Sequence, residues 1–138
     1  DFCAFHYNKT EPLAALQDDF VTFTFLGDTY ENKLKDADAV YMEATAYTDN
    51  GNTYEVKEKS AKSLMPKEES AVSNTFNLTI WPAEYFGIPE GETITRIEYI
   101  FTNKDGTLNI TGTDDKIAAE GGEAEGEEEP FICELACE

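Results

Sequence analysis

Apolar and polar residues alternate along most of this chain with the two-residue period of β-strands that bury one face. The pattern is clearest at residues 21–25, where valine and phenylalanine alternate with threonine. Residues 94–102 and 107–111 repeat it on either side of Asn103-Lys104-Asp105-Gly106. Because an Asp-Gly pair readily adopts the positive φ of a tight reversal, these two segments are predicted to form a β-hairpin.

Further strands are predicted at residues 2–7, 39–47, 53–56, 75–81 and 131–135. Residues 39–47 are partly apolar on both faces, which indicates a central strand. Residues 82–87 begin with Pro and end with Gly, as a one-turn helix would. About seven strands and no long helical period predict an all-β fold, an immunoglobulin-like antiparallel β-sandwich with short helical turns in its connections.

The two-residue period also predicts which side chains form the core of the sandwich. They are Val21, Phe23, Phe25, Val40, Met42, Phe76, Leu78, Ile80, Ile97, Tyr99, Phe101, Leu108 and Ile110. A chain of 138 residues is the size of one domain, so residues 1–138 are predicted to form a single sandwich. Residues 118–130 form an acidic, low-complexity loop, because residues 120–129 hold six Glu with only Gly and Ala between them.

The chain carries a formal net charge of −19, from 29 acidic and 10 basic residues. Such a surface repels the phosphates of nucleic acids and the headgroups of anionic membranes, so neither is an expected partner. No apolar run approaches the roughly 18 residues of a membrane-spanning helix. The acidic surface is interpreted as keeping the protein in solution, with attraction of a basic partner as the alternative.

Three cysteines, Cys3, Cys133 and Cys137, are too few for a disulfide scaffold, and they lack the spacing of a zinc site. Cys133 and Cys137 lie too far apart along one strand to bond each other. The first and last strands of such sandwiches are often close, so Cys3 is expected to pair with Cys133 or Cys137 in an oxidising compartment. Three free thiols are the alternative.

No combination of residues predicts catalysis or a cofactor. His6 is the only histidine, and no nucleophile motif lies near it. Oxygen-rich segments at residues 49–52, 103–106 and 113–115 lack the spacing of an EF-hand and are interpreted as turns rather than calcium sites. The chain is therefore predicted not to be an enzyme.

Trp81, the only tryptophan, precedes Tyr85 by one helical turn, with Glu84 between them. An exposed aromatic pair can stack on the apolar face of a sugar ring while a carboxylate accepts its hydroxyl protons. These three residues are the candidate ligand-binding site. Alternatively, Trp81 covers the core against Phe86, because tryptophan is highly buried on average.

The segments from Phe76 to Pro82, from Tyr85 to Glu92 and from Ile94 to Gly106 resemble β-sandwich modules of secreted or lipid-anchored glycan-utilisation proteins of gut bacteria. Those modules carry a Tyr-Phe-Gly-Val-Pro segment before a strand that ends in Phe-Arg-Asn-x-Asp-Gly. This chain has Ile88 in place of the Val and Thr102 in place of the Arg. The resemblance covers the last two-thirds of the chain and transfers no ligand-binding residue.

The resemblance implies a noncatalytic module that binds or accompanies glycans at a bacterial cell surface. Its partner would be a polysaccharide or another surface protein, and its location extracellular, at the cell surface or periplasmic. The opening at Asp1 without Met fits a processed chain. The alternative function is a structural spacer or protein-interaction domain of a larger surface assembly, with no sugar site.

Overall fold

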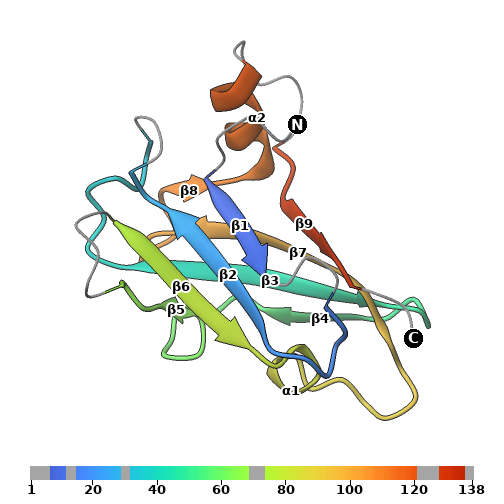
Figure 1. Cartoon of the computed structure of the whole chain (residues 1–138). Coiled ribbons are helices and arrows are strands. Elements are labelled where there is room, and N and C mark those ends of the chain that lie inside the picture. The colour runs from blue at the N-terminus through green and yellow to red at the C-terminus, as the bar shows by residue number, and fades with distance from the viewer. Residues whose placement is uncertain (1–6, 12–14, 29–31, 69–73, 121–127, 136–138) are drawn as a thin grey trace.

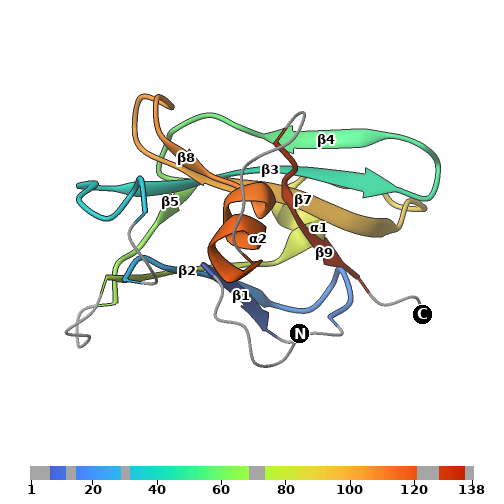
Figure 2. The ribbon, with the colours of Figure 1, turned by 90° about the horizontal axis from the view of Figure 1, so that it is seen from above.

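The computed structural model describes residues 7–11, 15–28, 32–68, 74–120 and 128–135. These residues form an all-β sandwich of antiparallel strands, as the alternating pattern predicts. Nine strands and two short helices lie within them, against the expected seven or so strands, and two of the nine are only two residues long. Figures 1 and 2 show the two sheets as facing layers.

The smaller sheet has three strands in the order β1-β2-β6. They are β1 (Asn8–Glu11), β2 (Val21–Leu26) and β6 (Thr75–Ile80). The larger sheet has the order β4-β3-β7-β8, with β5 also paired to β3 and β9 to β7. Its strands are β3 (Val40–Thr48), β4 (Thr53–Val56), β5 (Leu64–Met65), β7 (Ile94–Thr102), β8 (Asn109–Ile110) and β9 (Phe131–Glu134).

This pairing is that of an immunoglobulin-like sandwich. The pair β2–β6 corresponds to strands B and E of that fold, and β3–β7–β9 corresponds to strands C, F and G. The central position predicted for residues 39–47 is confirmed, because β3 lies between β4 and β7.

Aromatic rings from both sheets interlock in the core. Phe23 on β2 meets Tyr99 on β7 edge to face, with ring centroids 4.8 Å apart. Phe25 lies 5.1 Å from Phe101, which in turn lies 5.3 Å from Phe131. Offset and edge-to-face contacts of this kind add to the stabilisation that apolar burial provides. The core therefore follows the predicted period, with two exceptions.

Those exceptions are Leu78, which is only partly buried against the core, and Leu108, which is 41% exposed. The predicted return strand at residues 107–111 shortens to β8 because side chains of the turn take the backbone bonds. Asn103 Oδ1 accepts the Leu108 N–H at 3.1 Å, and Asp105 Oδ1 accepts the Thr107 N–H at 3.1 Å. Leu108 therefore belongs to the turn, and the prediction that it lies in the core is wrong.

The helix α2 (Gly112–Glu120), between β8 and β9, is absent from the sequence prediction. Thr111 and Asp114 form a reciprocal cap at its start, in which the Asp114 N–H donates to Thr111 Oγ1 and the Thr111 N–H donates to Asp114 Oδ2. The helix includes residues 118–120, so the acidic loop begins later than predicted. Residues 121–127 of that loop lie outside the described residues.

Of the strand predicted at residues 2–7, only Tyr7 falls within the described residues. Tyr7 precedes β1, and β1 itself is the polar segment Asn8–Glu11. Residues 1–6 lie outside the described residues. Inward-facing Thr10 on β1 bonds the buried Tyr99 hydroxyl at 3.0 Å, which explains how so polar a strand joins the sandwich.

Candidate functional site: an aromatic groove

The predicted one-turn helix is α1 (Pro82–Tyr85), with Pro at its start and Trp81 as its extended N-cap residue. The helix ends at Tyr85, and Gly87, which follows the C-cap residue Phe86, has a φ of 66° in the left-handed region. The Ala83 N–H, which has no partner within so short a helix, donates to the Gln17 carbonyl at 3.0 Å. This bond attaches α1 to the segment that leads into β2. Figure 1 shows α1 at the end of β6.

A groove of about 510 Å³ lies beside α1 at the end of the smaller sheet. All three predicted site residues, Trp81, Glu84 and Tyr85, line it, together with residues that the sequence prediction did not include. The added residues are Phe20, Lys62, Leu78, Thr79 and Ile80. The sequence-based grouping of Trp81, Glu84 and Tyr85 therefore corresponds to a single hollow.

Phe20 and Trp81 are the exposed rings of this groove, with exposed fractions of 71% and 42%. Val21 pairs with Ile80 across β2 and β6, so Phe20 and Trp81 occupy the next opposed positions in the same register. Val21 and Ile80 face the core, and their neighbours therefore face outward. The indole N–H of Trp81 lies 3.4 Å from Asp18 Oδ1, which orients the ring.

Tyr85 is buried, with 8% of its surface exposed, and forms the floor of the groove. Its hydroxyl donates to the Lys62 carbonyl at 3.3 Å, and the Lys62 ammonium lies 5.0 Å from its ring centroid. Burial, with a smaller contribution from Glu58, raises the pKa of Tyr85 to about 12. The expectation of an exposed Trp81–Tyr85 pair is corrected accordingly, since Phe20 is the second exposed ring.

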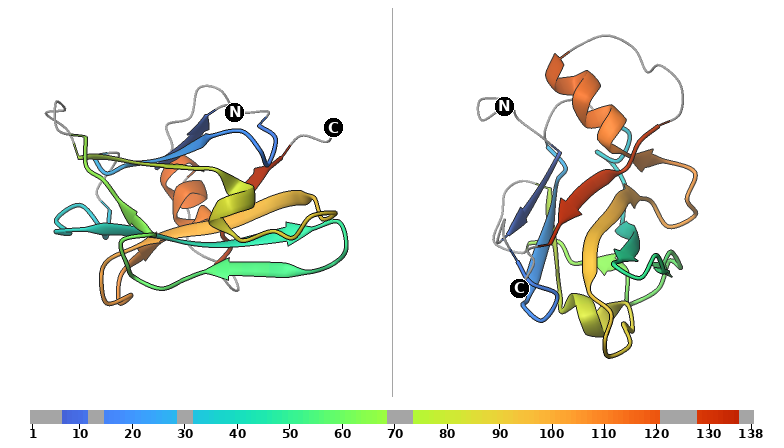
Figure 3. Two further views of the ribbon diagram at one scale, coloured as in Figure 1. Left: turned by 90° about the horizontal axis from the view of Figure 1, so that it is seen from below. Right: turned by 90° about the vertical axis from the view of Figure 1, so that its right-hand side faces the viewer.

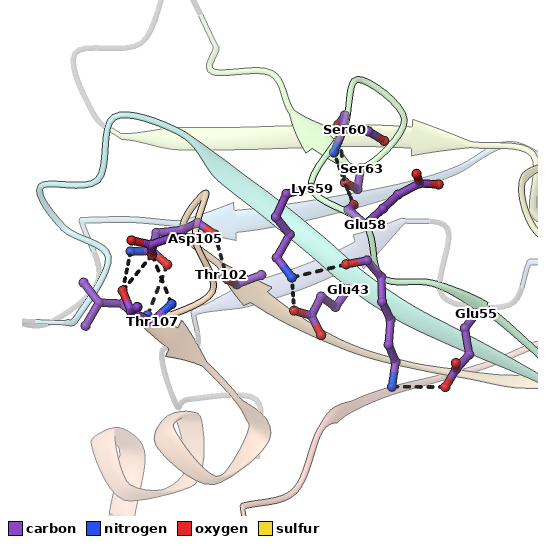
Figure 4. A network of polar contacts seen from close by, with 12 residues as sticks. Glu43, Glu55, Glu58, Lys59, Ser60, Ser63, Thr102, Asp105 and Thr107 are labelled. Carbon is purple, nitrogen blue, oxygen red and sulfur yellow. Dashed lines mark hydrogen bonds and ion pairs between the residues drawn. The ribbon is translucent and has the colours of Figure 1, made fainter.

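The connection from β4 to β5 forms the wall of the groove that carries Lys62. Within it the Ser63 hydroxyl donates to the Glu58 carbonyl, and the Ser60 N–H donates to Ser63 Oγ at 3.2 Å. The Lys59 ammonium bonds the Glu43 carboxylate on β3 (Figure 4). These contacts fix the loop to the larger sheet, and they thereby fix the position of Lys62 beside Tyr85.

Gln17 connects the groove to the start of β7. Its amide N–H₂ donates to the Glu92 carbonyl at 3.2 Å, and its amide oxygen accepts the Ile94 N–H at 2.7 Å. Its neighbour Asp18 orients Trp81. Gln17 therefore connects three parts of the structure: the segment that carries Phe20, the helix α1 and the first residue of β7.

The turn at residues 49–52 lies at this same end of the sandwich, because the Asp49 N–H donates to the Thr93 carbonyl at 3.0 Å and the Thr93 N–H donates to Asp49 Oδ1 at 3.0 Å. The Glu92 carboxylate holds the turn in place. It accepts hydrogen bonds from Asn52, Tyr54 and Thr48 at 3.1, 2.8 and 2.9 Å. None of the residues 49–52 lines the aromatic groove.

The three bonds to Glu92 predict a pH-dependent contribution to stability. The hydrogen bonds from Asn52, Tyr54 and Thr48, in that order of size, lower the pKa of Glu92 below its ordinary value. A lowered pKa in the folded state stabilises the protein above the unfolded pKa, and the contribution is lost as pH falls through the folded pKa. We expect the stability difference between wild type and Glu92→Gln to be largest near neutral pH and to shrink below about pH 4.

Urea unfolding at a series of pH values measures this difference. Glu90→Gln is the matched control, because Glu90 is an exposed residue of the same connection. A difference between wild type and Glu92→Gln that stays constant from pH 7 to pH 3 would contradict the assignment.

Cys133 has a free, buried thiol on the inward face of β9. Burial, and then the neighbouring Glu134, raises the pKa of this thiol to about 11. A raised pKa makes the thiol unreactive near neutral pH. Cys3 and Cys137 lie outside the described residues, and their pairing remains a prediction.

For protein isolated from an oxidising compartment, we expect one cysteine, Cys133, to be alkylated in denaturant before reduction and all three after it. Peptide mapping by mass spectrometry under non-reducing conditions identifies the alkylated residue. In the folded protein, Cys133 should react far more slowly than in denaturant. Alkylation of all three without reductant would exclude the bridge, and a bridged Cys133 would contradict its free thiol.

A second groove, of about 860 Å³, lies at the opposite end of the sandwich. It lies between the segment before β3 and the β7–β8 turn, and it is lined by Asn32, Lys33, Asp36, Ala37, Asp38, Ala39, Asn103, Lys104, Asp105 and Leu108. None of its described lining residues is aromatic. Within the described part of the chain, no group of three or more His, Cys, Asp or Glu side chains is arranged to hold a metal ion. His6, the one histidine, lies outside that part.

Most of the sandwich matches the model of a known protein family. Residues 8–110 match the model of a family described as a domain of unknown function, DUF8578. The chain belongs to the DUF8578 family. No curated protein matches the chain.

The part of the chain that matches DUF8578 contains the complete aromatic groove. It begins with β1 and ends with β8, so α2 and β9 lie outside it. Phe20, Trp81, Glu84 and their supporting residues Gln17 and Lys62 all lie inside it. Across the described residues, no helix combines the length and the apolar character needed to cross a membrane.

Proposed function

We propose that this DUF8578 chain is a noncatalytic module that binds glycans at a bacterial cell surface through the aromatic groove. The observation that carries the proposal is the two exposed rings of Phe20 and Trp81, which directly flank the paired residues Val21 and Ile80 and line one groove with the buried Tyr85. The motif resemblance to sandwich modules of glycan-utilisation proteins supports the same class of ligand.

The chemistry of the groove suits a sugar ring. The C–H faces of a pyranose are apolar and stack on aromatic rings, while its hydroxyls project around the edge. Asp18 and Glu84 flank the two exposed rings with carboxylates that accept hydrogen bonds from such hydroxyls. The Thr79 hydroxyl, also in the groove, both donates and accepts.

A noncatalytic role fits the exposure of these two carboxyls. Glycoside cleavage requires one carboxyl whose pKa is raised by burial, so that it can donate a proton to the leaving oxygen. Asp18 and Glu84 are both exposed; Glu84 lines the groove, and Asp18 lies beside it on the Trp81 indole. The proposal therefore assigns them to recognition. A shallow groove buries little of its ligand, so the affinity for a single sugar would be modest.

Affinity electrophoresis tests the proposal. Native gels that contain one polysaccharide each, covering neutral glucans, mannans and xylans, are compared with a gel that contains none. We expect at least one neutral polysaccharide to retard the protein relative to an unrelated acidic protein of similar charge. If no polysaccharide retards it, glycan binding is excluded, and a spacer or protein-interaction domain becomes the better account.

A further inference from the structure

A row of polar side chains continues from the aromatic groove along the outer face of the smaller sheet. Thr22 and Thr79 occupy the opposed positions next to Phe20 and Trp81 on that face, and their hydroxyls lie 2.8 Å apart. We call each pair of opposed, outward-facing positions a rung. At the next rung, the Thr24 hydroxyl donates to Asn77 Oδ1 at 2.7 Å. Thr79 also lines the groove, so the rings and the polar rungs form one continuous surface.

We infer that this surface, the outer strip, binds an extended segment of a neutral polysaccharide, with several sugar units lying along β2 and β6. The inference rests on the proposed function and specifies its ligand. Outward-facing positions repeat every two residues, so the aromatic pair and the Thr24–Asn77 pair, four residues apart, are separated by about 13 Å along the strands. That length exceeds one sugar ring and favours an internal stretch of polymer over a chain end.

The polar rungs retain hydrogen-bonding capacity for such a ligand. When one threonine hydroxyl donates to another, the accepting hydroxyl still has its own proton to donate, and both oxygens keep an acceptor site. Thr79 is exposed and Thr22 half-buried, so this rung is accessible from solvent. Thr24 is buried and supports Asn77 rather than contacting solvent.

The charges around the outer strip favour a neutral polymer. The nearby carboxylates are Asp18, Glu84, Glu68 and Glu11. The described cations beside the strip are Lys9, which pairs with Glu11 at 3.3 Å, Lys62, which lies over the Tyr85 ring, and Lys67, which pairs with Phe76 at the edge of β6. In a chain of net charge −19, this local excess of acid repels uronic or sulfated polysaccharides.

Binding to oligosaccharides of increasing length tests the inference. The probes are β-1,4-linked glucose, mannose and xylose oligomers of two to six units, measured by isothermal titration calorimetry, with polygalacturonate as the acidic comparison. The variant Thr22→Val/Thr79→Val removes both hydroxyls while keeping the β-branched shape of each side chain. Thr53→Val, on exposed β4 of the other sheet, is the matched control.

For wild type we expect the hexamer of at least one series to bind about 3- to 10-fold tighter than the dimer, since each added hydrogen bond is modest. The double variant should lose most of this gain, measured as its own hexamer-to-dimer ratio because Thr79 also lines the groove, and Thr53→Val should keep it. Three results would overturn the proposal for the outer strip but not the proposal for the groove. They are equal affinity for hexamer and dimer, an unchanged gain in the double variant, and a preference for polygalacturonate. Failure of wild type to bind any probe would overturn both proposals.

Discussion

Replacing Phe23 by Ala is expected to destabilise the protein by about 3–5 kcal/mol. Phe23 is fully buried, and its ring meets Tyr99 with centroids 4.8 Å apart. The change removes the apolar burial of the ring and leaves a cavity between the two sheets, where the packed neighbours Phe25, Tyr99 and Phe101 have limited freedom to close it. Because a domain is typically stable by only 5–15 kcal/mol, we expect a large drop in the midpoint of urea unfolding.

Phe20→Ala is the matched control, because it makes the same chemical change three residues away on a side chain that is 71% exposed. It should change the stability by less than about 0.5 kcal/mol. Equal losses for the two variants would contradict the assignment of Phe23 to the core and Phe20 to the surface. Circular dichroism of both variants establishes that each is folded before its unfolding is compared.

Replacing Trp81 by Ala is expected to remove most of the polysaccharide binding, with a loss of at least about 2 kcal/mol, or roughly 30-fold in Kd. Trp81 supplies the larger of the two exposed rings, and Asp18 holds it in orientation. Phe20→Ala should also weaken binding, by a smaller amount, because it removes the opposed ring. Isothermal titration calorimetry with the polysaccharide retained by wild type measures both losses.

Ile132→Ala is the control for nonspecific apolar contact. Ile132 is 58% exposed, but it lies on β9 in the larger sheet, away from the groove. Its removal should leave the affinity unchanged. If Ile132→Ala weakened binding as much as Trp81→Ala, the groove would not be the site. In the right-hand view of Figure 3, α1 (yellow) lies at the lower end of the molecule and β9 (red) lies above it.

The sequence was sufficient to predict the elements in which local pattern and tertiary packing agree. In β2 and β7, alternation of large apolar residues with polar ones fixes which face turns inward, and Phe23 and Tyr99 are buried as that alternation requires. The helix α1 was likewise predictable, because Pro82 fixes φ at its first residue and Gly87 readily adopts the positive φ that follows its end.

Other features were missed because one local signal competes with another. Leu108 follows the alternation of a strand, but the side chains of Asn103 and Asp105 capture the backbone of its turn. The start of α2 did have a local signal in the capping pair of Thr111 and Asp114, which lies next to acidic, low-complexity sequence that favours a loop.

Part of the candidate site could likewise be predicted from the sequence, and part could not. Trp81, Glu84 and Tyr85 are close in sequence, so their grouping was predictable. The burial of Tyr85 was not, because it depends on Lys62 from a distant loop. Phe20 could have been identified as outward-facing from its position before Val21, but its position opposite Trp81 follows only from the register of β2 with β6.

Fluorescence of Trp81 offers the most direct test of glycan binding in the groove, since it is the only tryptophan of the chain. Titrating the folded protein with the neutral polysaccharide that retards it in gels should change the emission of this one ring saturably. The half-saturation point should match the Kd from calorimetry. Binding detected by calorimetry without any change in Trp81 emission would place the ligand elsewhere on the molecule and contradict the proposed site.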